Sequence, residues 1–135
     1  MEEPILYHEE KILPLLNVKY NLLIAASMDR MLAHIEDMYE GVMLTGNPEA
    51  TSYTCIVNDG FSGRNCFVLI NKDKIKEDST TLIHEAVNIS WYALDCIGLT
   101  LNEKTKVIQG YLCEEIYKEI QNFLDENDST KLGSL

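Results

Sequence analysis

The stretch that decides the interpretation of this chain is Thr81-Leu-Ile-His-Glu-Ala-Val-Asn-Ile-Ser-Trp-Tyr-Ala-Leu-Asp-Cys-Ile-Gly98. Its apolar residues recur at steps of three and four, which predicts a helix that begins after Ser79 or Thr80 and ends at Gly98. The pattern predicts an apolar stripe that packs on a sheet and a more polar face beside it. The stripe comprises Ile83, Val87, Ser90, Leu94 and Ile97, and the polar face comprises His84, Asn88, Trp91 and Asp95.

Three residues of this helix form the pattern H-E-x-x-N: His84, Glu85 and Asn88. In the H-E-x-x-H pattern of zinc hydrolases, two histidines one turn apart share a metal ion, and the intervening glutamate polarises a water molecule. Here an amide occupies the second ligand position, and an amide oxygen is a poor zinc ligand beside an imidazole. The pattern therefore predicts a metal centre that lacks an essential ligand.

The chain before this helix predicts a small sheet and one further helix. An apolar run ends the segment 17–26, which predicts a buried strand, and residues 28–40 have the periodicity of a helix that covers the sheet. Segments 51–57 and 65–71 predict a β-hairpin. The unbroken apolar run Phe67-Val-Leu-Ile70 predicts that the second hairpin strand is central.

The two ends of the chain are rich in polar residues. Residues 1–16 contain two prolines and four glutamates, so we expect a mobile lead-in or a short edge segment. Residues 102–126 predict a third helix, and residues 125–135 a flexible polar tail. We therefore expect one α+β domain with its core in residues 17–124, in which a small mixed sheet of about three strands is packed by three helices.

The net charge of −11, from 22 acidic and 11 basic residues, limits the partners of this chain. Such a surface repels phosphates, so we expect no direct binding of nucleic acid. A basic protein partner suits this charge, and so does a protein that imitates the charge of a nucleic acid. Solubility alone also explains it.

Composition also indicates a compartment. The sequence contains no long apolar run, and its N-terminus lacks the basic and apolar regions of a signal peptide, so we expect a cytoplasmic protein without a membrane segment. None of its four cysteines are spaced as C-x-x-C, so reduced and mostly buried thiols are expected. These cysteines are Cys55, Cys66, Cys96 and Cys113.

The order of elements, with the H-E pattern in the helix after the hairpin, resembles the minimal zincin core. More specifically, it resembles a family of small zincin-like proteins of phages and prophages. The likeness covers roughly residues 51–121. It rests on the apolar strand Phe67-Val-Leu-Ile70, the motif Thr81-Leu-Ile-His-Glu-Ala-Val-Asn88, the helix end Asp95-Cys-Ile-Gly98 and the second-helix segment Val107-Ile-Gln-Gly-Tyr-Leu112.

The resemblance implies a degenerate site. His84 matches the first metal ligand of the family and Glu85 its general base, whereas Asn88 stands in place of the second histidine and Val107 in place of a glutamate ligand. A catalytic zinc site needs three protein ligands, so no metal or other cofactor is expected. A weak oxygen-rich site for a harder metal, formed by His84, Asn88 and Glu103, stays open as an alternative.

The same resemblance suggests a cleft that binds a partner. We expect His84, Asn88, Trp91 and Tyr111 to line it, with packing as the alternative role of the two aromatic residues. The remaining histidines are interpreted as solvated, for His8 in an acidic segment, and as a polar-edge or core residue, for His34 on a helix between apolar positions. Loose metal binding is the alternative for His8, and a third metal ligand is the alternative for His34.

Three functions follow as expectations. The first is a catalytically inactive phage or mobile-element accessory protein that binds a host protein, basic in character, or a small ligand in the host cytoplasm. The second is a metal-dependent peptidase, with Glu85 as general base and zinc or another divalent ion on His84. The third is an acidic inhibitor that imitates nucleic acid. The oligomeric state and the identity of the partner stay open.

Overall fold

The computed structural model describes residues 5–13, 16–39, 41–58, 63–76 and 78–127. Several predicted features lie outside the described residues. They are the start of the lead-in segment, the helix end at Glu40, most of the turn between the hairpin strands, and the tail from residue 128.

The described chain forms four strands and three helices. The strands build one mixed sheet in the order β1-β2-β4-β3, in which β2 and β4 are parallel neighbours at the centre and the two edge strands run antiparallel to them. The predicted α+β class and the hairpin are thereby confirmed. In chain order the elements are β1 (Tyr7–Leu13), β2 (Val18–Ala25), α1 (Met28–Met38), β3 (Ser52–Asn58), β4 (Arg64–Asn71), α2 (Thr81–Cys96) and α3 (Lys106–Glu126).

The fourth strand, beyond the predicted three, is β1. It lies in the segment for which the sequence left a mobile lead-in or an edge segment open, and it pairs with β2 at the edge of the sheet. The expectation of a central hairpin strand also holds, because β4 lies between β2 and β3.

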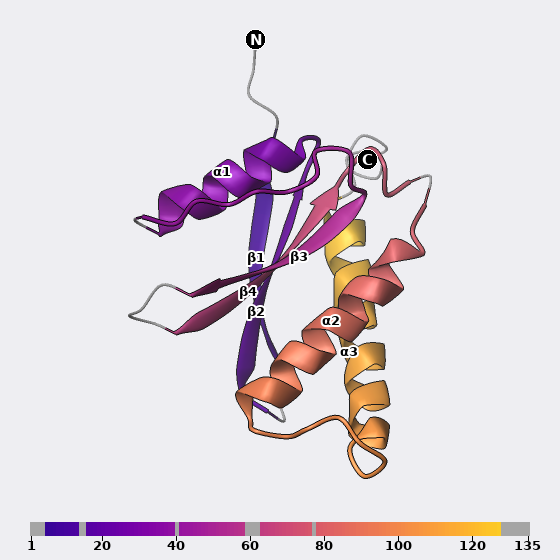
Figure 1. Cartoon of the computed structure of the whole chain (residues 1–135). Helices are drawn as coiled ribbons and strands as arrows, with labels where there is room; N and C mark the ends of the chain where they lie inside the picture. Colours follow the sequence, from indigo (N-terminus) through magenta and orange to yellow (C-terminus); the bar gives the residue numbers. More distant parts are fainter. Residues whose placement is uncertain (1–4, 14–15, 40, 59–62, 77, 128–135) are drawn as a thin grey trace.

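The sheet separates two apolar layers, with α1 on one face and with α2 and α3 on the other (Figure 1). This division follows from the alternation of side chains along a strand. In β2, Tyr20, Leu22 and Ile24 face α2 and α3, whereas Leu23 and Ala25 face α1. The apolar run of β2 is therefore buried on both faces, as its sequence predicts.

The packing face of helix α2 coincides only in part with the predicted stripe, of which Ser90 and Leu94 are buried. Ile83, assigned to the sheet-facing stripe, is 57% exposed, whereas Leu82, Ala86 and Ile89 are buried in the layer beneath the sheet. The reason is that α2 packs against both the sheet and α3. Its Ser90 faces α3, so the apolar positions are divided between the sheet and α3.

Helix α3 begins at Lys106 rather than at the predicted Asn102. The side-chain oxygen of Asn102 accepts hydrogen bonds from the backbone N–H groups of Lys104 (2.8 Å) and Thr105 (3.2 Å). Such local bonds favour a turn over a helix, so residues 102–105 form a turn that leads into α3.

Candidate functional site

Glu85 is the most deeply buried carboxylate of the motif helix, with 3% of its surface exposed. Its oxygens accept hydrogen bonds from the hydroxyl groups of Ser52 and Thr54 on β3, the latter at 2.6 Å, and from the amide of Asn88 at 3.3 Å. Ser52 and Thr54 stand two residues apart on one strand, so they point to the same face and meet the same carboxylate. These bonds connect α2 to the edge strand β3.

This arrangement limits what Glu85 does chemically. A general base must reach the proton that it removes, directly or through one water molecule. Both oxygens of Glu85 are instead engaged by protein donors, Ser52 on one oxygen and Thr54 and Asn88 on the other. The geometry is that of a structural acceptor.

His84 and Glu85 are adjacent in the sequence, but their side chains point in different directions. Consecutive residues of a helix point about 100° apart, and His84 is exposed to solvent while Glu85 faces β3. The side chain of Asn88 points toward Glu85 and donates a hydrogen bond to its carboxylate. The three residues of the H-E-x-x-N pattern therefore do not converge on one point in front of the helix.

The expected residues of α3 face away from α2. Gln109 and Cys113 contact Ser90 of α2, at 3.3 and 3.4 Å. Val107 and Tyr111 each stand two residues from Gln109, about 200° around the helix, and they are 74% and 58% exposed. Tyr111 therefore does not share a cleft with Asn88 and Trp91, and Val107 does not approach the motif.

The metal site that the resemblance raised as an alternative does not fit these positions. Glu103 forms an exposed ion pair with Lys106 at 3.1 Å, His84 points to solvent, and Glu85 is held by β3. Within the described ranges, no three His, Cys, Asp or Glu side chains are grouped so as to hold a metal ion. On α2 the chain offers one exposed imidazole, and zinc requires more ligands.

Trp91 marks the open part of α2. It is the only tryptophan of the chain, it is 49% exposed, and it borders two adjoining hollows of about 440 and 380 Å³. Asp95 also borders both. We give the name Trp91 surface to five residues that line these hollows: Ile56, Asn88, Trp91, Leu99 and Leu101.

An ion pair forms the rim of the larger hollow. The guanidinium group of Arg64, at the start of β4, donates to Asp95 of α2 and lies 5.6 Å from the centre of the Tyr92 ring. The hydrogen bond to Asp95 is the main cause that raises the pKa of Arg64 above its usual value. Arg64 is thereby paired within the molecule, and its positive charge is offset by the carboxylate of Asp95.

A polar pair that the sequence did not indicate lies on the other face of the sheet. His8 of β1 and His34 of α1 approach each other, with 3.1 Å between Nδ1 of His8 and Nε2 of His34. Burial, followed by the charges of His8 and Arg30, lowers the pKa of His34 below its usual value. The two histidines are 26 residues apart, and only the pairing of β1 with β2 brings them together.

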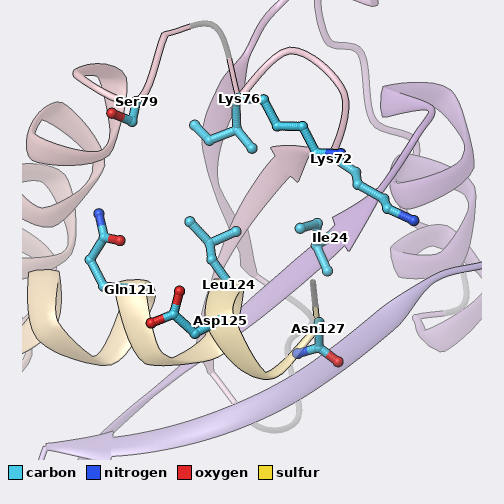
Figure 2. Close-up of a pocket in the computed structure, with 9 residues that line it drawn as sticks. Ile24, Lys72, Lys76, Ser79, Gln121, Leu124, Asp125 and Asn127 are labelled. Atoms are coloured by element: carbon cyan, nitrogen blue, oxygen red, sulfur yellow. The ribbon is translucent and has the colours of Figure 1, made fainter. Parts of the chain in front are cut away.

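A third hollow lies at the carboxyl ends of the parallel strands β2 and β4 (Figure 2). Ile24, Ile75 and Leu124 supply its apolar lining, and Leu124 projects into it from α3. Lys72 and Lys76 border it on the turn after β4. Its volume of about 220 Å³ is below the roughly 300–1,000 Å³ of common small-molecule sites, so it does not suit a typical metabolite.

Comparison with protein-family models, curated proteins and solved structures gave no match. Among the described residues, no helix has both the length and the apolar character needed to cross a bilayer.

Proposed function

We propose that this chain acts by binding a partner protein through the Trp91 surface, and not by catalysis. The observation that carries the proposal is the half-exposed Trp91 between two hollows. Tryptophan is enriched among the residues that contribute most to protein binding, because it combines a large apolar area with few rotatable bonds. Exposed Leu99 and Leu101 extend the same apolar area.

The hydrogen bonds and the burial of Glu85 support a function of this chain that does not involve catalysis. The peptidase alternative needs this carboxylate at a metal-bound water, but it accepts from Ser52, Thr54 and Asn88 and is almost fully buried. Activity would require those bonds to break. A binding role requires only the surface as it stands.

Charge indicates the character of the partner. The chain carries a net charge of −11, and the carboxylate of Asp95 is exposed at the edge of both hollows. We propose a partner that places an apolar side chain beside Trp91 and basic residues around it. The encounter would take place in the cytoplasm, and the phage or mobile-element origin stays a prediction from the resemblance alone.

A matched pair of variants tests this proposal. Trp91→Ala should abolish capture of the partner from a cell extract. Tyr111→Ala, which removes a still more exposed aromatic ring on the far side of α3 (58% against 49%), should leave capture unchanged. Quantitative mass spectrometry of the captured proteins measures both effects. Proteins retained equally by both variants would contradict a role for the Trp91 surface.

Salt distinguishes this proposal from imitation of nucleic acid. Association through an apolar surface should persist when ionic strength rises, because salt screens charges but not apolar contacts. A complex held by the acidic surface alone should weaken steeply as salt increases. Fluorescence of the single tryptophan, titrated with the identified partner at low and high salt, reports the difference.

A further inference from the structure

Two of the three histidines of the chain lie next to each other. His8 is on the edge strand β1 and exposed, and His34 is half-buried on α1, with 3.1 Å between the facing nitrogens. Their rings are perpendicular, with centres 5.2 Å apart. The two imidazoles therefore present ring nitrogens, rather than ring faces, to each other.

A buried amide fixes the orientation of His8. The Nδ2 group of Asn21 donates to the backbone carbonyl of Cys66 at 3.2 Å, so its Oδ1 is the atom that faces Nε2 of His8 at 2.9 Å. A carbonyl oxygen only accepts, which means that Nε2 of His8 carries a proton. In the neutral ring, Nδ1 of His8 then has a free lone pair, and it points toward His34.

We propose that His8 and His34 bind a divalent late first-row transition-metal ion through Nδ1 of His8 and Nε2 of His34. Imidazole nitrogens lie about 2.0–2.1 Å from such an ion, so two that share it at ordinary angles are roughly 3.0–3.4 Å apart. The observed separation of 3.1 Å falls in that interval. His8 already has a free lone pair on Nδ1. For His34 to bind the ion, its proton must be on Nδ1, so that Nε2 is free to coordinate.

The contact to Asn21 is typical of a metal ligand. Histidines that bind metals donate their other N–H group to a carboxylate, a carbonyl or water, which fixes the tautomer and orients the ring. His8 makes this bond to an amide that is itself held by the backbone of β4. The orienting bonds are therefore present without the ion.

The ligands also restrict the kind of metal. Two neutral imidazoles suit Cu²⁺, Ni²⁺ or Zn²⁺, with Cu²⁺ bound most tightly, and they do not suit Ca²⁺ or Mg²⁺, which prefer oxygen. In the described part of the chain no third His, Cys, Asp or Glu joins the pair. Water or a group from a partner would complete the coordination, and exposed His8 leaves room for either.

The experiment is titration calorimetry of untagged, reduced protein with Ni²⁺ and Zn²⁺, chosen because the exposed thiol of Cys96 would reduce Cu²⁺. We expect one ion per chain. His8→Ala and His34→Ala should each weaken binding by about tenfold or more, and Asn21→Ala by about ten- to a hundredfold. His84→Ala, which removes the third histidine, on α2 at the other face of the sheet, is the matched control and should bind as the wild type does.

Nitrogen NMR of the imidazole rings during zinc addition reports the ligands directly. Shifts at Nδ1 of His8 and Nε2 of His34 would support the site. No shift of either ring, or full affinity in His8→Ala, would overturn it and leave the pair as a hydrogen bond only. Circular dichroism verifies the fold of each variant, and His8→Ala decides the matter if His34→Ala does not fold, because His8 is exposed.

Discussion

At the scale of single residues, Glu85 is the side chain whose role differs most from its motif. We predict that Glu85→Ala lowers the free energy of unfolding by about 1–3 kcal/mol, because the hydroxyl groups of Ser52 and Thr54 lose their acceptor. Urea denaturation of both proteins measures the difference.

Glu114→Ala is the control for that prediction. It removes an exposed carboxylate on α3 and should change the stability by no more than about 0.5 kcal/mol. Equal effects of the two substitutions would contradict the structural role of Glu85. That result would favour a role of Glu85 in a reaction.

The hydrogen-bond partners of Glu85 do not follow from its motif. The motif identifies Glu85 as notable, but its partners Ser52 and Thr54 lie 33 and 31 residues earlier on another element. His8 and His34 likewise show no ligand spacing in the sequence, because 26 residues separate them. Local patterns predict residue types and faces, whereas these contacts depend on which strand lies beside which helix.

At the scale of elements, periodicity is informative where one face of an element is buried. It predicted α1, the hairpin and α2 as elements, because the apolar residues of each recur at the step typical of a helix or a strand. It misassigned part of the packing face of α2, since that helix contacts both the sheet and α3, and two apolar faces overlap on its surface. It left β1 undecided because its alternating residues include Glu9 and Lys11, which form an ion pair at 2.8 Å instead of an apolar stripe.

The relation between α2 and α3 gives a second prediction. In a zincin, histidine at position 88 and glutamate at position 107 would complete a zinc site. Here Val107 points away from α2, so we predict that Asn88→His with Val107→Glu gains no zinc binding. Calorimetry in a His8→Ala background, which removes the proposed site on the other face, measures this. One tightly bound zinc ion per chain would contradict the helix arrangement and support the zincin resemblance.

At the scale of the whole molecule, the sheet separates two surfaces that share no residue. The Trp91 surface belongs to α2, β3 and the segment after α2, whereas His8 and His34 lie on the α1 face. Each of the two proposals can therefore be contradicted without affecting the other. Loss of partner binding in Trp91→Ala says nothing about metal binding, and His8→Ala should leave partner binding intact.

The buried core makes the stability of the fold sensitive to alkaline pH. Burial raises the pKa of the Cys66 thiol from 9.0 to about 12. It also raises the pKa of Tyr20 above its usual value, with the hydrogen bond to Glu119 as the second cause. The folded state therefore keeps these groups neutral at a pH at which the unfolded chain releases their protons. Since the unfolded chain then binds fewer protons, stability is fully present below about pH 9 and is lost as pH rises.

For Cys66 alone, we predict a loss of about 1.4 kcal/mol in the free energy of unfolding between pH 8 and pH 10, because one pH unit above the unfolded pKa corresponds to that energy. Urea denaturation under reducing conditions at the two pH values measures it. Cys66→Ala is less stable at pH 8 because it leaves a cavity, but its further loss up to pH 10 should be smaller by about the same amount. An equal pH dependence in both proteins would mean that the Cys66 thiol ionises without unfolding, and that water reaches the centre of the sheet.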